Sequence, residues 1–275
     1  MELKLVAGRE GRLSSFLRGE LKMSLGLMNR LKWGDAIQVN GQPQHTDFAV
    51  KSGDVITVRL DEPLPEYPAE QGVLTVLYED EHILMVDKPA GMLIHPSRSK
   101  NTGTLANLVL GYYQKTGQQA AFHPVTRLDR DTFGIVLVAK NSHIHSLLQA
   151  ADIKKTYHAL VFGQPGESGI VDAPIARRPL PSLLRYISPE GKPSVTEYVC
   201  LEQFEGYAKP ILGDPQYGNE KSQDFSAGFE MTSQALCAKR LEFVHPITEQ
   251  PVCVESQMDA DDMLHEITIY HGIPL

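Results

Sequence analysis

Four charged residues crowd into five positions just before an apolar segment at residues 134–140, namely Arg127, Asp129, Arg130 and Asp131. A carboxylate flanked by two arginines should stay ionised, and charge-assisted hydrogen bonds should hold it in place. Such a group can act as a nucleophile or as a base. A loop of surface ion pairs is the more common origin of this composition. Asp129 is therefore a candidate reactive group whose assignment depends on the rest of the chain.

The elements around this segment predict an α+β domain. Strands outnumber helices and do not alternate regularly with them, which predicts a mixed, mainly antiparallel sheet with helices packed against it. An acidic turn at residues 79–82 separates the first two strands as a hairpin. Strands are predicted at 73–77, 83–86, 134–140, 156–162, 195–201, 240–244 and 252–256, and helices at 105–113 and 142–151.

A second, smaller α+β unit precedes this domain. Leu13, Phe16, Leu17 and Leu21 have helical spacing, and a second helix is predicted from Ser24 as N-cap to Gly34. Strands follow at 37–39 and 55–58, the first of them leading into an Asn-Gly turn. Three prolines and four acids at residues 61–70 indicate a linker. We therefore expect domains at residues 1–60 and 71–275.

Charge divides unevenly between the two parts. The chain of 275 residues has a formal net charge of −8, yet residues 1–60 sum to +3 and the remainder to −11. Binding to nucleic acid needs clustered Lys and Arg, so an RNA-facing role falls to the first part, where Lys22, Arg30 and Lys32 surround the second predicted helix. The same residues would also suit an ordinary solvated surface.

Composition narrows the class of protein further. The sequence contains no run of eighteen apolar residues, so we expect no membrane span. The first residues do not resemble a secretory signal. Three widely spaced cysteines predict neither a disulfide framework nor a zinc site. We expect a cytoplasmic protein.

The segment His123–Lys140 resembles the signature of RluA-type pseudouridine synthases, in which Arg-Leu-Asp is followed by an acid, Thr and Gly before a strand. Four further runs resemble landmarks of that family in the expected order: 86–96, 155–161, 210–218 and 241–246. The resemblance covers residues 73–258. Residues 10–60 resemble an S4-like RNA-binding module through Ile37-Gln38-Val39-Asn40-Gly41 and the run 51–56.

The resemblance implies a reaction and roles for particular residues. Enzymes of this family detach uracil from C1′ of the ribose, turn it and rejoin it through C5, without a cofactor, a metal or an energy source. By the resemblance Asp129 is the catalytic carboxylate. Arg127 would fill the space left by the flipped uridine, and Tyr157 would stack on the base. Arg130 would contact the RNA with Lys22, Arg30 and Lys32. The implied partner is ribosomal RNA in preference to transfer RNA, and we expect a monomer.

One family landmark is absent. A segment of some twenty residues, carrying Gly-Arg-Thr-His-Gln-Ile-Arg with an active-site arginine, is expected where Tyr207 passes directly to Ala208. The chain could be a deletion, natural or experimental, that is folded around a gap and inactive. Alternatively, the sequence omits a segment that the protein contains. We favour the second, because losing a core strand should cost more than the roughly 5–15 kcal/mol that a domain has to spare.

Other interpretations stay open at this stage. A non-catalytic RNA-binding protein could keep this fold without its chemistry. A metal-dependent hydrolase could use Asp129 and Asp131, although two acids without a third clustered ligand are a weak signal. His143 and His145 are two apart on a predicted helix and do not share a face, so they are interpreted as surface or packing residues. Gly91 and Gly134 fit turns.

Overall fold

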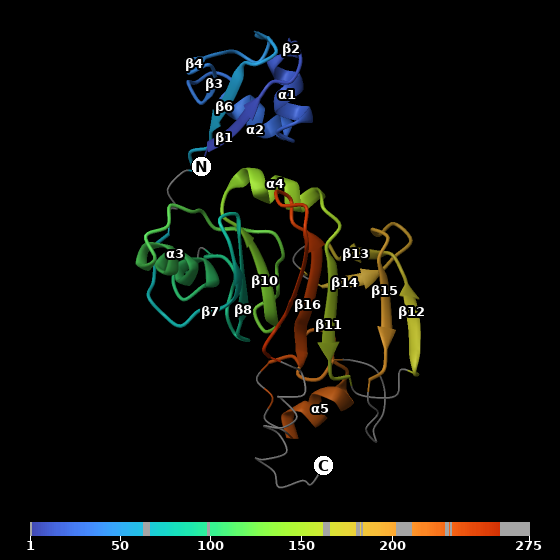
Figure 1. Ribbon diagram of the computed structural model, residues 1–275. Helices are drawn as coiled ribbons and strands as arrows, with labels where there is room; N and C mark the ends of the chain where they lie inside the picture. Colours follow the sequence, from blue (N-terminus) through green and yellow to red (C-terminus); the bar gives the residue numbers. More distant parts are fainter. Residues whose placement is uncertain are drawn as a thin grey trace. The chain divides into compact units, whose positions relative to one another are not determined.

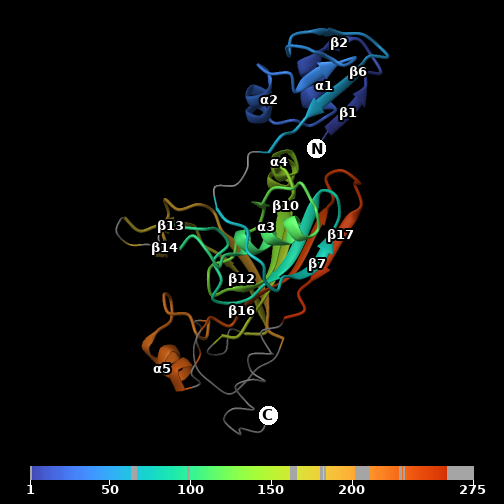
Figure 2. The ribbon, with the colours of Figure 1, turned by 90° about the vertical axis from the view of Figure 1, so that its left-hand side faces the viewer.

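The computed structural model describes residues 2–62, 67–97, 100–161, 166–179, 182, 184–201, 211–228, 231 and 233–258. The chain divides into two compact units, one made of residues 1–157 and 237–259 and the other of residues 158–236 and 260–275. Figures 1 and 2 show the elements of each unit. No helix among the described residues has the length and apolar character needed to cross a membrane.

Residues 2–60 form a small module with its own core. A four-stranded antiparallel sheet in the order β1-β6-β3-β4 packs with helices α1 and α2. Ser24 caps α2 as predicted, since its hydroxyl accepts a hydrogen bond from the Leu27 backbone, but the helix ends at Leu31 before Gly34. The prediction missed β1. The elements are β1 Glu2–Val6, β2 Gly11–Arg12, α1 Leu13–Gly19, α2 Leu25–Leu31, β3 Ile37–Val39, β4 Gln42–Pro43, β5 Ala49–Val50 and β6 Val55–Arg59.

A seven-stranded mixed sheet carries the segment around Asp129. Its order is β11-β16-β10-β8-β7, with β17 on β16 and β9 on β10. Pairings are antiparallel between β7, β8 and β10 but parallel between β10 and β16. The predicted α+β fold with a mixed, mainly antiparallel sheet is confirmed. The strands are β7 Thr75–Glu79, β8 Ile83–Lys88, β9 His123–Pro124, β10 Phe133–Ala139, β11 Lys154–Ala159, β16 Leu236–Val244 and β17 Pro251–Glu255.

Alternating side chains of the central strands form a core on each face of this sheet. Leu84, Val86, Val136 and Val138 pack with helix α3 (Leu105–Lys115) on one face. Ile83, Met85, Ile135 and Leu137 pack with helix α4 (Ser142–Ala150) on the other. The period of two along each strand thus requires a helix on both sides, which explains why these strands read as continuous apolar runs.

The other unit holds smaller elements, most of which the sequence did not predict. Strand β12 (Ser168–Asp172) pairs with β15 (Val195–Val199), and β13 (Ile175–Arg177) pairs with β14 (Arg185–Ile187). Helix α5 spans Glu220–Gly228. Only β15 was predicted, because the other strands are short and exposed and lack a clear apolar alternation.

Gly134 lies inside β10 and not in the turn that the sequence suggested. Its φ is +105°, and a Cβ placed there would lie 2.5 Å from the carbonyl oxygen of Ala238 in β16. A side chain at this position would therefore separate the parallel strands β10 and β16. Glycine is required because of this close approach.

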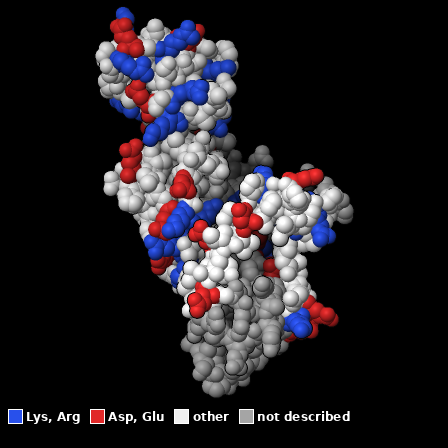
Figure 3. All heavy atoms as spheres, turned by 90° about the vertical axis from the view of Figure 1, so that its right-hand side faces the viewer, with Lys and Arg blue, Asp and Glu red and all other residues white. Residues whose placement is uncertain are grey.

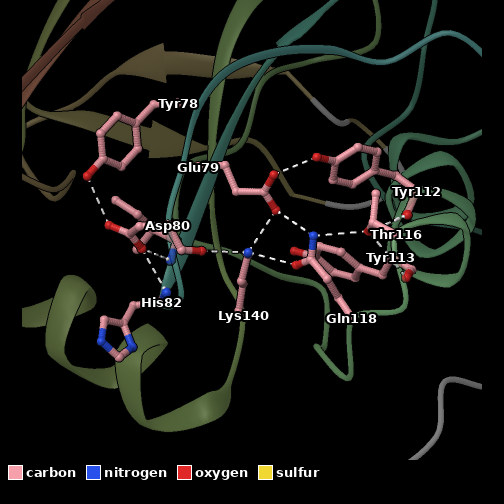
Figure 4. Close-up of polar contacts among 10 residues, drawn as sticks. Tyr78, Glu79, Asp80, His82, Tyr112, Tyr113, Thr116, Gln118 and Lys140 are labelled. Atoms are coloured by element: carbon pink, nitrogen blue, oxygen red, sulfur yellow. Dashed lines mark hydrogen bonds and ion pairs between the residues drawn. The ribbon is translucent and has the colours of Figure 1, made fainter.

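A polar cluster ties the far end of β10 to its neighbours (Figure 4). The Lys140 ammonium donates to Glu79 Oε1 at 2.7 Å, to the Asp80 carbonyl at 2.6 Å and to Gln118 Oε1 at 2.8 Å. Tyr112 and Gln118 also donate to the Glu79 carboxylate, at 2.5 and 2.9 Å. Burial raises the pKa of Glu79, but these hydrogen bonds outweigh it and lower the pKa overall. The cluster is a structural support that holds the turn of the β7–β8 hairpin against the end of β10.

Candidate active site

The segment that carries Asp129 is held to the sheet at its beginning by Thr126. The Thr126 hydroxyl accepts a hydrogen bond from the Leu137 backbone N–H at 2.9 Å, and the Val125 N–H donates to the Leu137 carbonyl at 2.8 Å. Thr126 itself is buried. These bonds fix where the chain leaves the core, so the loop starts from a rigid position in the middle of β10.

Lys88 holds the same loop at its other end. Its side chain is fully buried, and its ammonium donates to the carbonyls of Arg130, Met92 and Pro89 at 2.9, 2.9 and 3.0 Å. Burial lowers the pKa of Lys88 to about 8, while the charges of Asp131 and Asp129 oppose the shift. Three carbonyls thus satisfy all three N–H groups of a buried cation, as burial of a charge requires.

Lys88 had no predicted role, although the sequence contained a signal for one. It ends a strand whose other residues are buried, and a lysine there must find acceptors or destabilise the core. Its acceptors are backbone carbonyls, which the sequence does not display. The side chain is a positioning residue for the loop, because it bonds to the carbonyl of the residue next to Asp129.

Asp129 is exposed at the centre of this loop. Among the described residues its carboxylate has no hydrogen-bond or ion-pair partner. The expected charge-assisted bonds from its arginine neighbours are not present: Arg130 instead forms a bidentate pair with Asp131, with both N···O distances 2.9 Å. Adjacent residues can form this fork more readily because the chain need not fold back. Asp129 is left open to a ligand.

The charges of this loop affect the pKa values of two further side chains. Tyr157 in β11 is 43% exposed, and burial together with the negative charge of Asp129 raises the pKa of its phenol. Burial and the positive charge of Arg127 lower the pKa of His95. Arg127 is exposed and has no hydrogen-bond partner among the described residues. Tyr157 thus lies within electrostatic range of Asp129, and His95 lies within electrostatic range of the exposed Arg127.

The predicted RNA-contacting residues of the module lie at its surface. Lys22 and Arg30 are exposed, with contacts to Glu249 at 3.4 Å and to the Ser142 hydroxyl at 2.9 Å within the same unit. Lys32 caps the end of α2. On the face drawn in Figure 3, Lys and Arg side chains gather over the module with some Asp and Glu among them. Lys22 and Arg30 are accessible and Lys32 is half-buried, and exposed contacts of this kind contribute little stability.

The position of the missing Arg-containing segment, between Tyr207 and Ala208, lies outside the described residues. Further along the chain, the Leu212 N–H donates to the Leu160 carbonyl at 3.0 Å, and the Ala235 N–H donates to the Leu212 carbonyl at 2.9 Å. The segment that begins at Ile211 therefore pairs with the residues that follow β11.

Comparison with known proteins decides the family. Residues 82–244 match the sequence profile described as RNA pseudouridylate synthase, and this range contains Lys88, Asp129 and Tyr157. The chain belongs to the RNA pseudouridylate synthase family. The predicted resemblance to the RluA type is confirmed, and the enzyme is an isomerase that acts on RNA.

Alignments with individual relatives extend over most of this synthase. It is 34% identical to the RNA pseudouridine synthase YjbO of Bacillus subtilis, over 88% of this chain and 94% of the relative. It is 30% identical to the ribosomal large subunit pseudouridine synthase D of Xanthomonas campestris, over 84% and 80%. The alignment with YjbO is 273 positions long, whereas it covers only 88% of the 275 residues of this chain. The alignment is thus longer than the part of this chain that it contains. It therefore includes positions at which this chain has no residue.

Solved structures support the fold. The human RNA Pseudouridylate Synthase Domain Containing 4 superimposes with a TM-score of 0.53 at 18% identity, covering 70% of this chain and 92% of that one. The human RNA Pseudouridylate Synthase Domain Containing 1 superimposes with a TM-score of 0.52 at 18% identity, covering 72% of this chain and 97% of that one. The synthase therefore has the pseudouridine synthase fold.

Proposed function

We propose that this synthase isomerises uridines in structured ribosomal RNA and that Asp129 is its reactive carboxylate. The observation that carries the proposal is the loop around Asp129, which Thr126 and Lys88 hold in place. It presents an exposed carboxylate, without a partner among the described residues, within electrostatic range of Tyr157. A buried framework that holds one accessible carboxylate suits nucleophilic attack or stabilisation of charge at the ribose.

Tyr157 and Arg127 supply the other two roles in this proposal. The phenol of Tyr157 keeps its proton at neutral pH, because burial and the Asp129 charge raise its pKa, and its half-exposed ring can stack on a flipped uracil. Arg127, exposed and unpaired among the described residues, can enter the space that the uridine leaves in the RNA. Arg130 contributes to phosphate contacts from its place beside Asp131.

The choice of ribosomal RNA rests on relatives whose printed names specify the large ribosomal subunit, including those of Xanthomonas campestris and Nitrosomonas europaea. The module at residues 2–60 provides Lys22, Arg30 and Lys32 as S4-like contacts to RNA. We propose that the synthase works in the cytoplasm as a monomer without metal or cofactor.

The test is incubation of the synthase with unmodified ribosomal and transfer RNA, followed by mapping of pseudouridine at single-nucleotide resolution. We expect product at discrete sites in ribosomal RNA, and none with Asp129→Asn at equal RNA affinity. Asp152→Asn is the matched control, because that aspartate is exposed and lies outside the Asp129 loop. Full turnover by Asp129→Asn would overturn the assignment of the carboxylate.

The absent arginine segment gives the second candidate, a member of the family that binds RNA without modifying it. Binding of ribosomal RNA with no product under any condition would favour this candidate and reject the first. RNA cleavage that depends on an added divalent ion would instead indicate a hydrolase that uses Asp129 and Asp131. No group of three or more metal-ligating side chains occurs among the described residues, which argues against that outcome.

A further inference from the structure

Trp33 is the only tryptophan of the chain and one of its most exposed apolar side chains, with 79% of its surface accessible. It follows α2 in the N-terminal module but takes no part in the module's core. Burying an indole is among the larger single gains available to a small domain. The ring therefore remains outside although the module has a well-formed core, which points to a role on the surface.

The surroundings of Trp33 are aromatic and cationic. The His45 ring, from the loop between β4 and β5, lies 5.0 Å from the indole between ring centroids at an interplanar angle of 42°. The Lys32 ammonium lies 5.2 Å from the indole centroid. Two rings from separate loops and a cation thus share one small patch of surface.

The orientation of His45 is fixed by an acid. Asp47 Oδ1 lies 2.7 Å from His45 Nδ1, and this bond lowers the pKa of the exposed Asp47. A ring nitrogen bonded to a carboxylate carries the proton, which leaves the other nitrogen at the ring's far edge. Asp47 also adds a negative charge to the patch, partly opposed by Arg12. The patch is therefore suited to a flat ligand more than to a dense row of phosphates.

We propose that Trp33 and His45 form a stacking platform for an unpaired nucleobase of the RNA, apart from the uridine that reacts at Asp129. Aromatic rings stack on any base through its π face, and a nearby cation offsets the adjoining phosphate. Bases within a duplex are already stacked and cannot use such a platform. The choice of RNA as ligand rests on the proposed function, whereas the platform itself rests on the geometry of Trp33, Lys32 and His45.

The single tryptophan allows a direct test. The Asp129→Asn variant, which leaves the module unchanged, is titrated with a short single-stranded oligonucleotide and with a duplex of equal length while the tryptophan fluorescence is recorded. We expect saturable quenching by the single strand and little by the duplex. Quenching should persist at high salt, since stacking releases few counterions. Equal quenching by the duplex or by inorganic polyphosphate would overturn the proposal.

Substitutions give the second arm of the test. By anisotropy of a labelled oligonucleotide, Trp33→Leu should weaken binding about tenfold and Trp33→Phe should restore most of it, as expected for stacking worth about 1–3 kcal/mol. Leu25→Ala is the matched control, an apolar side chain 55% exposed on α2, the helix that precedes Trp33. Unchanged affinity in Trp33→Leu would overturn the platform. Product from unmodified RNA without quenching would reject the platform and leave the proposed function standing, whereas quenching without product would do the reverse.

Discussion

At the scale of single residues, Asp129 owes its availability to how its neighbours are occupied. Arg130 is engaged by Asp131, and Lys88 is saturated by three carbonyls, so neither cation neutralises the Asp129 carboxylate through a direct bond. The loop thus keeps the Asp129 carboxylate accessible, which suits a group that must meet an electron-poor centre.

Substitution of Tyr157 tests a residue whose pKa is raised in part by the charge of Asp129. Tyr157→Phe should keep the stacking surface and lower kcat with little change in KM, because the lost hydroxyl lies in the field of the reacting carboxylate. Tyr157→Ala should also raise KM about tenfold, through loss of stacking. Steady-state kinetics with ribosomal RNA would measure both. A larger KM effect from Phe than from Ala would contradict the assignment.

The sequence predicted Asp129, Arg127 and Tyr157 through ordered motifs, but not the bonds that position them. The pairing of Arg130 with Asp131 could not be read from the sequence, because two arginines and two acids within five residues allow several pairings of similar energy. The role of Lys88 was hidden for a related reason. Its partners are backbone carbonyls, whose direction depends on the turn that follows and not on residue type.

At the scale of elements, the apolar strands β8 and β10 and helices α3 and α4 were predicted with small errors at their ends. Their amphipathic or continuously apolar patterns reflect burial directly. Strands β12 to β14 were missed because they are short and exposed, so that no pattern of burial marks them. The wrong prediction of a turn at Gly134 has another cause. The glycine is needed because Ala238, far away in the sequence, leaves no space for a Cβ there.

The Glu79 cluster predicts a specific response to mutation. Lys140→Met should lower the free energy of unfolding by about 3 kcal/mol, since it leaves a half-buried carboxylate without its cation. The pKa of Glu79 is depressed below its ordinary value of 4.5, so its contribution is present above that pH and is lost as the pH falls further. Urea denaturation of wild type and variant should show stabilities that converge well below pH 4.5. A difference independent of pH would contradict the ion pair's role.

At the scale of the whole molecule, the division of charge predicts a division of labour. Deleting residues 1–60 should weaken binding to ribosomal RNA and flatten its dependence on salt, because the deletion removes the most basic part of the chain. Replacing Lys22, Arg30 and Lys32 together by Gln should reduce the slope of log affinity against log salt by about 2–3. Filter-binding titrations over a range of salt would measure both. An unchanged slope would contradict RNA contact by these residues.

The mass of the purified synthase would separate the two interpretations of the absent arginine segment. We expect an intact mass above 30.5 kDa by the mass of that segment, consistent with positions in the alignment with YjbO that this chain does not fill. Mass spectrometry of the intact protein measures this directly. A mass of 30.5 kDa would mean that the segment is absent, and an inactive enzyme would then be expected.

The parallel pairing of β10 with β16 has a consequence for how the synthase is made. Residues 133–134 pair with residues 237–238, so the strand that leaves the Asp129 loop gains this neighbour only after a hundred further residues have been synthesised. Loop closure over such a distance is slow compared with local pairing. A nascent chain on the ribosome would therefore hold the β7–β8 hairpin long before it held a competent loop. Catalytic competence should appear late in translation, once β16 has left the exit tunnel.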